Sequence, residues 1–372
     1  MLKILHTADI HLGAKFLGLG DKGAYQREQV RATFRNVIAT AIDEKVNIVL
    51  IAGDLFDANQ QPQRNIDLVI EQFNLLGQNN IPVCLIPGTH DSLDSSSIYR
   101  KVDFETKCSN LKIFTDEDIS CKEYPDIDLT VYGKPNLSNR SYVSPLKGLK
   151  AMTSTRFHIA MAHGSFYIPE KIAEDDHVFK LEEVEVSGMD YLALGHWHRM
   201  YACSEKPPSW YPGPPEWIPD QREKGAVLLV SLSEEGVKVD PNVIGLRDYD
   251  EVDIEASGIQ GVSELKERIH DGADRNLVRK ATVKGLHDAG LIVDPEDLVR
   301  ELGEEFFHLS IIDKSHPKTV EISETGYDEQ LIVARFVKLM KAQIELSEGE
   351  EKDIAENALQ YGIALLDGKE VL

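Results

Sequence analysis

The sequence has few cysteines, few basic residues and no long apolar run. Its four cysteines lie far apart without a CxxC spacing, which argues against a disulfide framework and a thiolate zinc site; they are Cys84, Cys108, Cys121 and Cys203. Because no apolar stretch approaches ~18 residues, we expect no transmembrane helix and no membrane partner. The first residues, MLKILHTADIH, enter a predicted strand without room for a signal peptide. These absences predict a soluble, cytoplasmic protein.

The shortage of basic residues limits the partners that the surface can bind. The 372 residues include 40 Lys and Arg against 63 Asp and Glu, a formal net charge of −23. This charge argues against indiscriminate coating of nucleic acid or of an anionic membrane. It leaves room for a local basic groove, or for a site that overcomes phosphate repulsion with bound cations. The length and the 42% hydrophobic content are sufficient for two or three domains.

Short apolar strands alternate with helical patterns over the first two-thirds of the chain. The strand-like runs are 3–6, 47–52, 83–86, 129–132, 158–162 and 191–194, and the helical patterns are 26–44 and 63–77. The strands have few polar interruptions, so we expect them to be buried on both faces of a layered α/β domain. We interpret the Pro- and Trp-rich segment 206–219 as an ordered surface loop with tryptophan anchors, and strands at 226–232 and 237–239 close the domain.

The rest of the chain predicts a small α/β unit and a helical tail. Strands are expected at 252–256, 281–286 and 306–312, with helices at 262–272 and 294–303. Two amphipathic helices follow, joined by an acidic connection at 347–353; their apolar stripes are Val333, Val337, Met340 and Ile344 in one, and Ile354, Ala358, Tyr361 and Leu365 in the other. The predicted domains are therefore 1–245, 246–322 and 323–372.

Five polar motifs each follow the carboxyl end of an apolar strand, the edge where open α/β sheets bind ligands. They are ADIH (8–11), GDLFD (53–57), GTHD (88–91), AHG (162–164) and GHWH (195–198). Taken singly, each has an ordinary explanation as a turn, a helix N-cap or a packed core histidine. Together they offer carboxylates and imidazoles, which suit manganese, iron or zinc better than calcium. Their common placement favours a two-metal site.

The motifs ADIHLG, AGDLFD, PGTHD, AHGS and GHWH resemble the five signature motifs of calcineurin-like metallophosphoesterases. Within that superfamily, HTADIHLG, AGDLFD and GHWH followed by YPGPPE are similar to the SbcD-type DNA-repair exonucleases. The resemblance covers residues 1–245 and extends more loosely to 250–322, which is similar to that family's capping domain. It implies a layered metallophosphoesterase β-sandwich flanked by helices, a small α/β capping domain and C-terminal helices.

The resemblance also implies two metal ions, manganese foremost with iron or zinc as alternatives. The implied ligands are Asp9, His11 and His198 for the first ion, Asp54 for both, and Thr89, His163 and His196 for the second. Thr89 departs from the family's pattern, which has asparagine there. Because a hydroxyl is a shorter and poorer neutral donor than an amide oxygen, we expect the second ion to be held more loosely.

The implied catalytic residues are His90 and Asp57. His90 would lie beside the scissile phosphate and protonate the departing oxygen, and Asp57 would orient His90. A helix-capping carboxylate is the alternative role for Asp57. We expect Asp91 to cap a helix that begins in the serine-rich SLDSSS.

The resulting hypothesis is a metal-dependent DNA exonuclease, with endonuclease activity as a second mode, in DNA repair or DNA processing. Basic residues that follow the first two motifs can contact phosphate or be solvated loop charges; they are Lys15, Lys22, Arg27 and Arg64. The helical tail can dock an SbcC-type ATPase or a second copy of the chain, or its helices can pack on each other. The alternatives are a phosphodiesterase for small or cyclic nucleotides and a scaffold with a weakened metal site. A protein phosphatase is disfavoured, because GDLFD and GTHD differ from GDxVDRG and GNHE.

Overall fold

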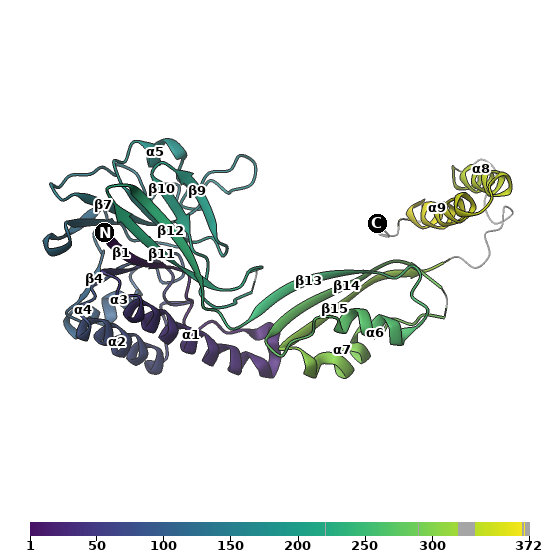
Figure 1. Ribbon diagram of the computed structural model, residues 1–372, viewed down its shortest axis with the longest axis horizontal. Helices are drawn as coiled ribbons and strands as arrows, with labels where there is room; N and C mark the ends of the chain where they lie inside the picture. Colours follow the sequence, from purple (N-terminus) through teal and green to yellow (C-terminus); the bar gives the residue numbers. More distant parts are fainter. Residues whose placement is uncertain (220, 289, 319–331, 367, 369–372) are drawn as a thin grey trace. The chain divides into compact units, whose positions relative to one another are not determined.

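The chain divides into two units, Met1–Tyr249 and Asp250–Leu372, in a computed structural model (Figure 1). The structure describes residues 1–219, 221–288, 290–318, 332–366 and 368. The predicted boundary between 322 and 323 lies outside these residues. None of the described helices is long and apolar enough to span a membrane.

The first unit contains a mostly parallel sheet with the strand order β12-β11-β1-β2-β3-β4. Its strands are β1 (Leu2–Thr7), β2 (Ile48–Ala52), β3 (Val83–Ile86), β4 (Leu111–Ile113), β11 (Ala226–Ser233) and β12 (Gly236–Val243). β1 to β4 are parallel, whereas β11 and β12 pair antiparallel. Helices α1 (Gly23–Asp43) and α2 (Gln63–Gln78) follow β1 and β2 and cover one face of this sheet (Figure 1).

A second sheet completes a sandwich, with the strand order β5-β6-β7-β8-β10-β9. Its strands are β5 (Ser120–Tyr124), β6 (Leu129–Gly133), β7 (Phe157–His163), β8 (Tyr191–Gly195), β9 (Tyr201–Glu205) and β10 (Pro208–Tyr211). One buried cluster joins the sheets, with Ile4 and Leu50 from the first and Val131 and Ile159 from the second. Short elements connect the strands: η1 (Leu17–Lys22), α3 (Ile98–Lys101), α4 (Phe104–Lys107), η2 (Pro125–Ile127) and α5 (Leu181–Glu185).

The predicted surface loop at 206–219 is wrong. Strand β10 lies inside it and pairs parallel with β8, placing Ser209 opposite Leu192. Residues 211–218 are buried, and Trp217 is only 6% exposed. Its ring stacks on Phe16 and Tyr249, so it is an anchor as predicted, but an anchor inside the core. The prolines suggested turns, whereas the large apolar area of the aromatic rings is what the fold buries.

His6 makes the first unit sensitive to acid. In β1 its Nδ1 lies 2.9 Å from the Tyr191 hydroxyl and its Nε2 lies 3.1 Å from the Leu194 carbonyl oxygen. Burial lowers the pKa of His6 to about 3. The unfolded chain therefore takes up this proton first, and the stability present above about pH 6.5 is lost as the pH falls toward 3.

We therefore expect the unfolding free energy to fall by about 1.4 kcal/mol per pH unit below about pH 6 through this residue. Urea denaturation at pH 7, 6 and 5 measures the slope, with His6→Gln as the comparison. The unfolding free energy of His6→Gln should fall less steeply with pH, by about 1.4 kcal/mol per pH unit, because one proton fewer is taken up on unfolding. Equal slopes in the two proteins would contradict the assignment.

The second unit begins with a three-stranded sheet in the order β13-β14-β15. The strands are β13 (Asp248–Glu255), β14 (Leu277–His287) and β15 (His308–Pro317); the helices are α6 (Val262–His270), α7 (Pro295–Leu302) and η3 (Gly303–Glu305). Leu265, Ile269 and Leu298 of α6 and α7 pack with Ala281 and Val283 of β14. Together with the sandwich and the tail helices, this unit confirms the predicted fold class. Its capping role stays a prediction.

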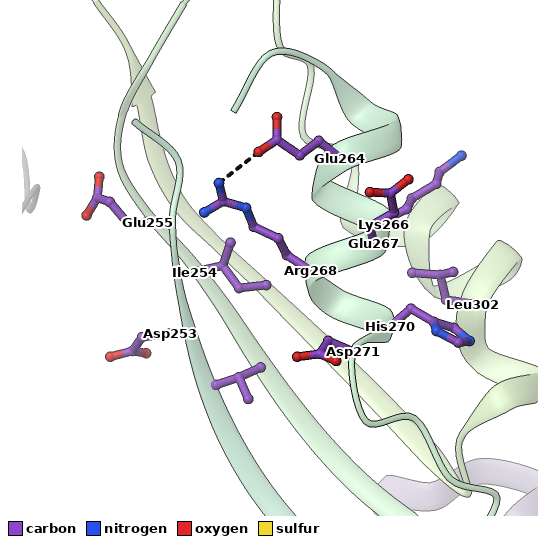
Figure 2. A pocket seen from close by; sticks show the side chains of 11 residues that line it. Asp253, Ile254, Glu255, Glu264, Lys266, Glu267, Arg268, His270, Asp271 and Leu302 are labelled. Atoms are coloured by element: carbon purple, nitrogen blue, oxygen red, sulfur yellow. Dashed lines mark hydrogen bonds and ion pairs between the residues drawn. The ribbon is translucent and has the colours of Figure 1, made fainter. Parts of the chain in front are cut away.

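A hollow of about 1040 Å³ lies beside β13 and α6 (Figure 2). Carboxylates dominate its lining: Asp253, Glu255, Glu264, Glu267 and Asp271, against the cations Lys266 and Arg268. Arg268 is paired with Glu264 at 2.7 Å. Because like charges repel, this hollow disfavours phosphate ligands.

The tail helices are α8 (Ile332–Leu346) and α9 (Glu350–Leu366), and they pack on each other. The predicted stripe of α8 is confirmed, since it packs with Leu359 and Ile363 of α9. The predicted stripe of α9 is wrong: Ile354 and Leu365 are 62% and 45% exposed. The buried positions of α9 are instead Ala355, Leu359, Ile363 and Ala364, and of the predicted stripe Tyr361 is partly buried against Leu286. The helix begins at Glu350, so the connection is shorter than the predicted 347–353.

Candidate metal centre

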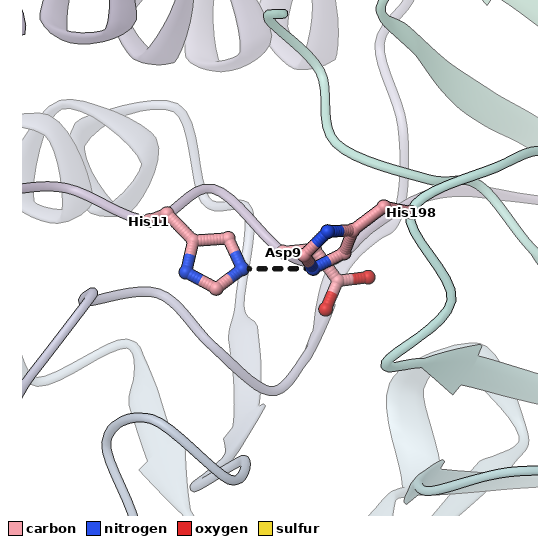
Figure 3. Close-up of side chains that lie close together, drawn as sticks. All are labelled: Asp9, His11 and His198. Atoms are coloured by element: carbon pink, nitrogen blue, oxygen red, sulfur yellow. Dashed lines mark hydrogen bonds between the residues drawn. The ribbon is translucent and has the colours of Figure 1, made fainter. Parts of the chain in front are cut away.

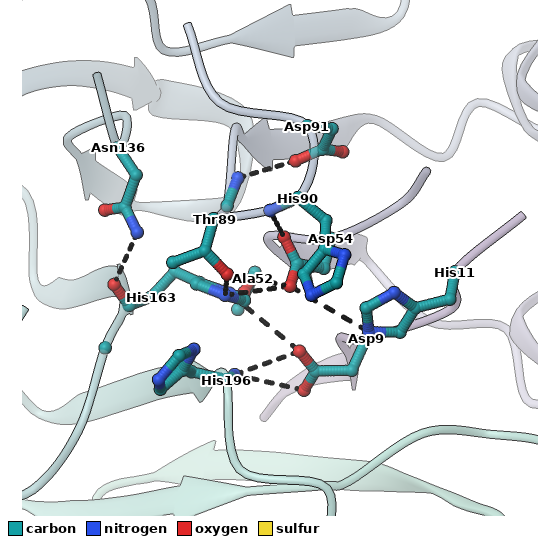
Figure 4. Close-up of polar contacts among 12 residues, drawn as sticks. Asp9, His11, Ala52, Asp54, Thr89, His90, Asp91, Asn136, His163 and His196 are labelled. Atoms are coloured by element: carbon teal, nitrogen blue, oxygen red, sulfur yellow. Dashed lines mark hydrogen bonds and ion pairs between the residues drawn. The ribbon is translucent and has the colours of Figure 1, made fainter. Parts of the chain in front are cut away.

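The five motifs meet where the carboxyl ends of both sheets come together (Figure 4). ADIH, GDLFD and GTHD follow β1, β2 and β3, whereas AHG and GHWH end β7 and β8. Backbone contacts join the first two loops, since the His11 N–H donates to the Asp54 carbonyl at 3.0 Å. Across the sandwich, the His196 N–H donates to the Asp9 carboxylate at 3.0 and 3.1 Å. Strand topology therefore brings together residues as distant in the sequence as Asp9 and His196, which are 187 positions apart.

Asp9, His11 and His198 form one group of potential ligands (Figure 3). Their ligand atoms lie within 4.8 Å of one another, and the Nε2 atoms of His11 and His198 are 3.2 Å apart. Burial, with the nearby His11, lowers the pKa of His198 to about 3, so its ring is neutral at pH 7. Two imidazole nitrogens that converge beside a carboxylate suit a shared cation.

Asp9, Asp54 and His163 form a second, fully buried group. His163 Nε2 lies 3.2 Å from Asp54 Oδ2, and its Nδ1–H donates to the Ala52 carbonyl at 2.8 Å. Burial favours the neutral ring, but the carboxylates of Asp54 and Asp9 raise the pKa of His163 to about 9. Burial also raises the pKa of Asp9 to about 6. A bound cation would therefore displace protons from this group.

The Thr89 hydroxyl points toward the second group of potential ligands. Its Oγ1 lies 3.2 Å from Asp54 Oδ2 and 3.4 Å from His163 Nε2 (Figure 4). A neutral oxygen donor thus stands at the second group, although a hydroxyl is a weak one.

His196 lies next to the second group and is held by a carboxylate that the sequence analysis missed. Its Nε2–H donates to Asp176 Oδ1 at 3.1 Å, and Asp176 Oδ2 accepts the Ser165 hydroxyl at 2.6 Å. An imidazole whose Nε2–H is bound to a carboxylate presents its other nitrogen as a ligand atom. Asp176 lies in an acidic run, EDD at 174–176, that matches no motif.

His90 and Asp57 stand at the open side of the centre. The His90 side chain is 48% exposed, and its Nδ1–H donates to the backbone carbonyl of Asp57 at 3.1 Å. The Asp57 carboxylate is nearer to His11 Nδ1, at 3.3 Å, than to His90 Nδ1, at 4.0 Å. The N-cap of α2 is Pro62, so Asp57 does not cap that helix.

Asp91 ties two of the loops together instead of capping a helix, so the predicted cap is wrong. Its Oδ1 accepts the Gly88 N–H at 2.7 Å, and its Oδ2 accepts the Phe56 N–H at 3.1 Å. The Tyr99 hydroxyl adds a third donor, at 2.5 Å. A buried carboxylate needs such donors, and helix α3 is capped by Ser97.

The backbone is strained at four of the predicted ligands. Their φ angles are positive: 54° at Asp9, 50° at His11, 51° at Asp54 and 108° at His196. Such conformations cost about 1–3 kcal/mol each and cluster at functional sites. Gly88 allows the close approach of two loops, because a Cβ there would lie 2.2 Å from Asp54 Oδ1.

The sequence model of the calcineurin-like phosphoesterase family matches residues 2–200, more than half of the chain. The chain belongs to this family. The donors fit the dinuclear metal site of such phosphoesterases, because two buried carboxylates face converging imidazole nitrogens. Among the described residues, no lysine or arginine forms an ion pair with Asp9 or Asp54.

Curated relatives of this phosphoesterase include DNA repair proteins. It is 29% identical to the DNA double-strand break repair protein Mre11 of Aeropyrum pernix, over 63% of this chain and 58% of that protein. It is 32% identical to Mre11 of Sulfolobus acidocaldarius, over 53% of this chain and 50% of that protein. It is also 30% identical to the uncharacterized metallophosphoesterase YhaO of Bacillus subtilis, over 61% of this chain and 57% of that protein. The chain thus spans 50% to 58% of the length of these relatives.

Replacing Asp176 should loosen one ion of the phosphoesterase. Without its carboxylate partner the His196 ring loses its fixed tautomer and orientation, so we expect Asp176→Ala to weaken binding of the second ion by ~10-fold. Manganese titration followed by calorimetry resolves the two affinities. Asp175→Ala, which removes only the surface pair with Arg140, is the matched control. Equal affinities in both variants would show that Asp176 does not position His196.

Proposed function

We propose that this phosphoesterase is a two-metal-dependent nuclease that hydrolyses DNA phosphodiester bonds, as an exonuclease with endonuclease activity as a second mode. The observation that carries the proposal is the pair of ligand groups that share Asp9, with Asp54 Oδ2 near His11 of one and His163 of the other, and with His90 open to solvent beside them. Support for DNA as the substrate comes from the relatives named as double-strand break repair proteins.

The ligands divide between two ions, with manganese foremost and iron or zinc as alternatives. Asp9, His11 and His198 would hold the first ion, Thr89, His163 and His196 the second, and Asp54 both. Two bound divalent ions supply Lewis-acid polarisation of the phosphate and lower the pKa of an attacking water. Asp54 suits the bridging position because His163 and His11 hold its pKa well below the usual range, despite its burial.

His90 would supply a proton to the departing oxygen. Because its Nδ1–H donates to the Asp57 carbonyl, Nε2 is the atom that carries the transferable proton. Its exposed ring lines a hollow beside the centre, where a substrate can reach it. The Asp57 carboxylate raises the pKa of His11, against the effect of burial.

Cleavage of labelled single- and double-stranded DNA with added manganese tests the proposal. We expect products with manganese and none with a chelator. If neither single- nor double-stranded DNA is cleaved with manganese, even with an SbcC-type ATPase supplied, the proposal is contradicted. Hydrolysis of cyclic or other small nucleotide esters much faster than DNA would favour the alternative phosphodiesterase.

We also propose that the tail helices dock an SbcC-type ATPase. After α8 and α9 pack on each other, apolar side chains are left exposed on both: Ile332, Leu339, Leu346, Ile354 and Leu365. A second copy of the chain is the alternative occupant. Leu339→Glu with Ile354→Glu should abolish co-purification with the ATPase while leaving metal binding unchanged; retained association would contradict the proposal.

Thr89 sets how firmly the second ion is held. We expect Thr89→Asn to tighten that ion by about tenfold, because an amide oxygen is a better neutral donor than a hydroxyl. Manganese titration of the activity and of the binding heat measures the change. The affinity of the first ion serves as the internal control, and an unchanged second affinity would refute the assigned ligand.

A further inference from the structure

Two hollows border the metal centre, and both are lined by His196. One, of about 790 Å³, contains Thr89 and His90. Its described lining has no lysine or arginine and is rich in amides and hydroxyls: Asn59, Gln60, Ser92, Ser96, Ser138 and Asn139. The other, of about 650 Å³, contains His198 and three basic residues. We call it the basic pocket, and its cations are Lys171, Arg199 and Arg222.

The Arg199 guanidinium is held in place by aromatic rings. It lies 4.9 Å from the centre of the Trp197 ring and 5.0 Å from that of Tyr201. Trp197 is itself fixed, because its Nε1–H donates to the Ser165 hydroxyl at 3.0 Å and its ring stacks on Tyr211. A guanidinium on an aromatic face keeps its N–H edge available for a planar anion such as phosphate.

The charge of the basic pocket opposes that of the whole chain. Three cations line it against one carboxylate, Glu223, whose Oε2 accepts the Met200 N–H at 3.3 Å. The formal balance is 3 − 1 = +2 in a chain of net charge −23. The hollow of the second unit, in contrast, is acidic. Among these hollows, the basic pocket is therefore the one suited to an anionic group next to the candidate metal ligands.

We infer that the basic pocket binds a second phosphate of the substrate, the one adjacent to the scissile phosphate in a polynucleotide strand. The inference rests on the proposed function. It makes the preferred substrate a nucleic-acid strand with at least two phosphodiesters, because a cyclic mononucleotide has only one phosphate and leaves the pocket empty. His90 lies in the other hollow, which is lined, among the described residues, by the Asp94 carboxylate and by no lysine or arginine, so the departing group and the second phosphate have different surroundings.

The test compares single-stranded oligonucleotides in which one phosphate at a time is replaced by an uncharged methylphosphonate. For the unmodified chain, neutralising the adjacent phosphate should lower kcat/KM by ~10-fold, the scale of one charge-assisted hydrogen bond. Arg199→Gln should lower kcat/KM by ~10-fold on the fully charged strand. On the strand neutralised at the adjacent phosphate, the same variant should differ little from the unmodified chain. The dependence of kcat/KM on salt should become shallower in the same variant.

Lys171→Gln disturbs no aromatic stack, so it tests the pocket even if Arg199→Gln fails to fold. Its loss of kcat/KM should likewise disappear on the strand neutralised at the adjacent phosphate. Arg156→Gln is the matched control, because Arg156 is an exposed arginine paired with Glu234 at the start of β7. It should retain the full rate. If the unmodified chain cleaves no DNA, the proposed function fails; if it cleaves DNA but no methylphosphonate position couples to Arg199 or Lys171, the inference alone is overturned.

Discussion

His90→Ala should lower kcat for DNA cleavage by ~10³-fold while the protein still binds two ions. The loss falls in the range of general acid catalysis, since only the proton donor for the departing oxygen is removed. Metal binding should survive because His90 contacts Asp54 through its backbone, its N–H donating to Asp54 Oδ1 at 2.8 Å, and alanine keeps that bond. Single-turnover rates at saturating manganese, together with metal analysis, measure both quantities.

A matched control is His316→Ala, a partly exposed histidine of β15 in the second unit. It should leave the rate unchanged. Activity of His90→Ala within a few-fold of the unmodified chain would contradict the role of His90. Such a result would also favour a leaving group that departs without a proton.

Asp54→Asn should have a still larger effect, because Asp54 joins both halves of the centre. Its Oδ2 lies 3.2 Å from His163 Nε2 and 3.9 Å from His11 Nε2. An amide keeps the shape but removes the negative charge that lets one side chain hold two cations. We expect the metal content to fall from two ions to one, and kcat to fall by ~10³–10⁴-fold, as the loss of several kcal/mol of transition-state stabilisation implies.

The metal content of Asp54→Asn is read by elemental analysis after gel filtration, and the rate by the same DNA assay. Asp67→Asn, an exposed change in α2, is the control for handling and folding. Retention of two ions by Asp54→Asn would show that this side chain does not bridge them.

The buried strands of a layered α/β domain could be predicted because they follow from local patterns, and so could the placement of each motif at the carboxyl end of a strand. Near-continuous apolar runs indicate strands buried on two faces, and the carboxyl ends of parallel strands share an edge. This rule places three motifs at the edge of one sheet and two at the edge of the other, but it does not bring the two edges together. The resemblance added the sandwich that joins the two edges, and which side chain would belong to which ion.

What the sequence did not show depends on contacts between distant segments. Asp176 lies 20 residues before His196 in the connection between β7 and β8, where an isolated bridge pairs it with Ser141. Lys171, Arg199 and Arg222 come from three separate loops, so no run of basic residues in the sequence predicts the basic pocket. Asp91 resembled a helix cap locally, but a neighbouring loop supplies its donor from Phe56.

Anomalous diffraction from crystals soaked in manganese tests the metal centre most directly. We expect two peaks per chain, one bounded by Asp9, His11 and His198, the other by Thr89, His163 and His196, with Asp54 contacting both. The second peak should be the weaker at limiting manganese, because Thr89 is a poor donor. A single peak, or two peaks that do not share Asp54, would contradict the two-metal mechanism.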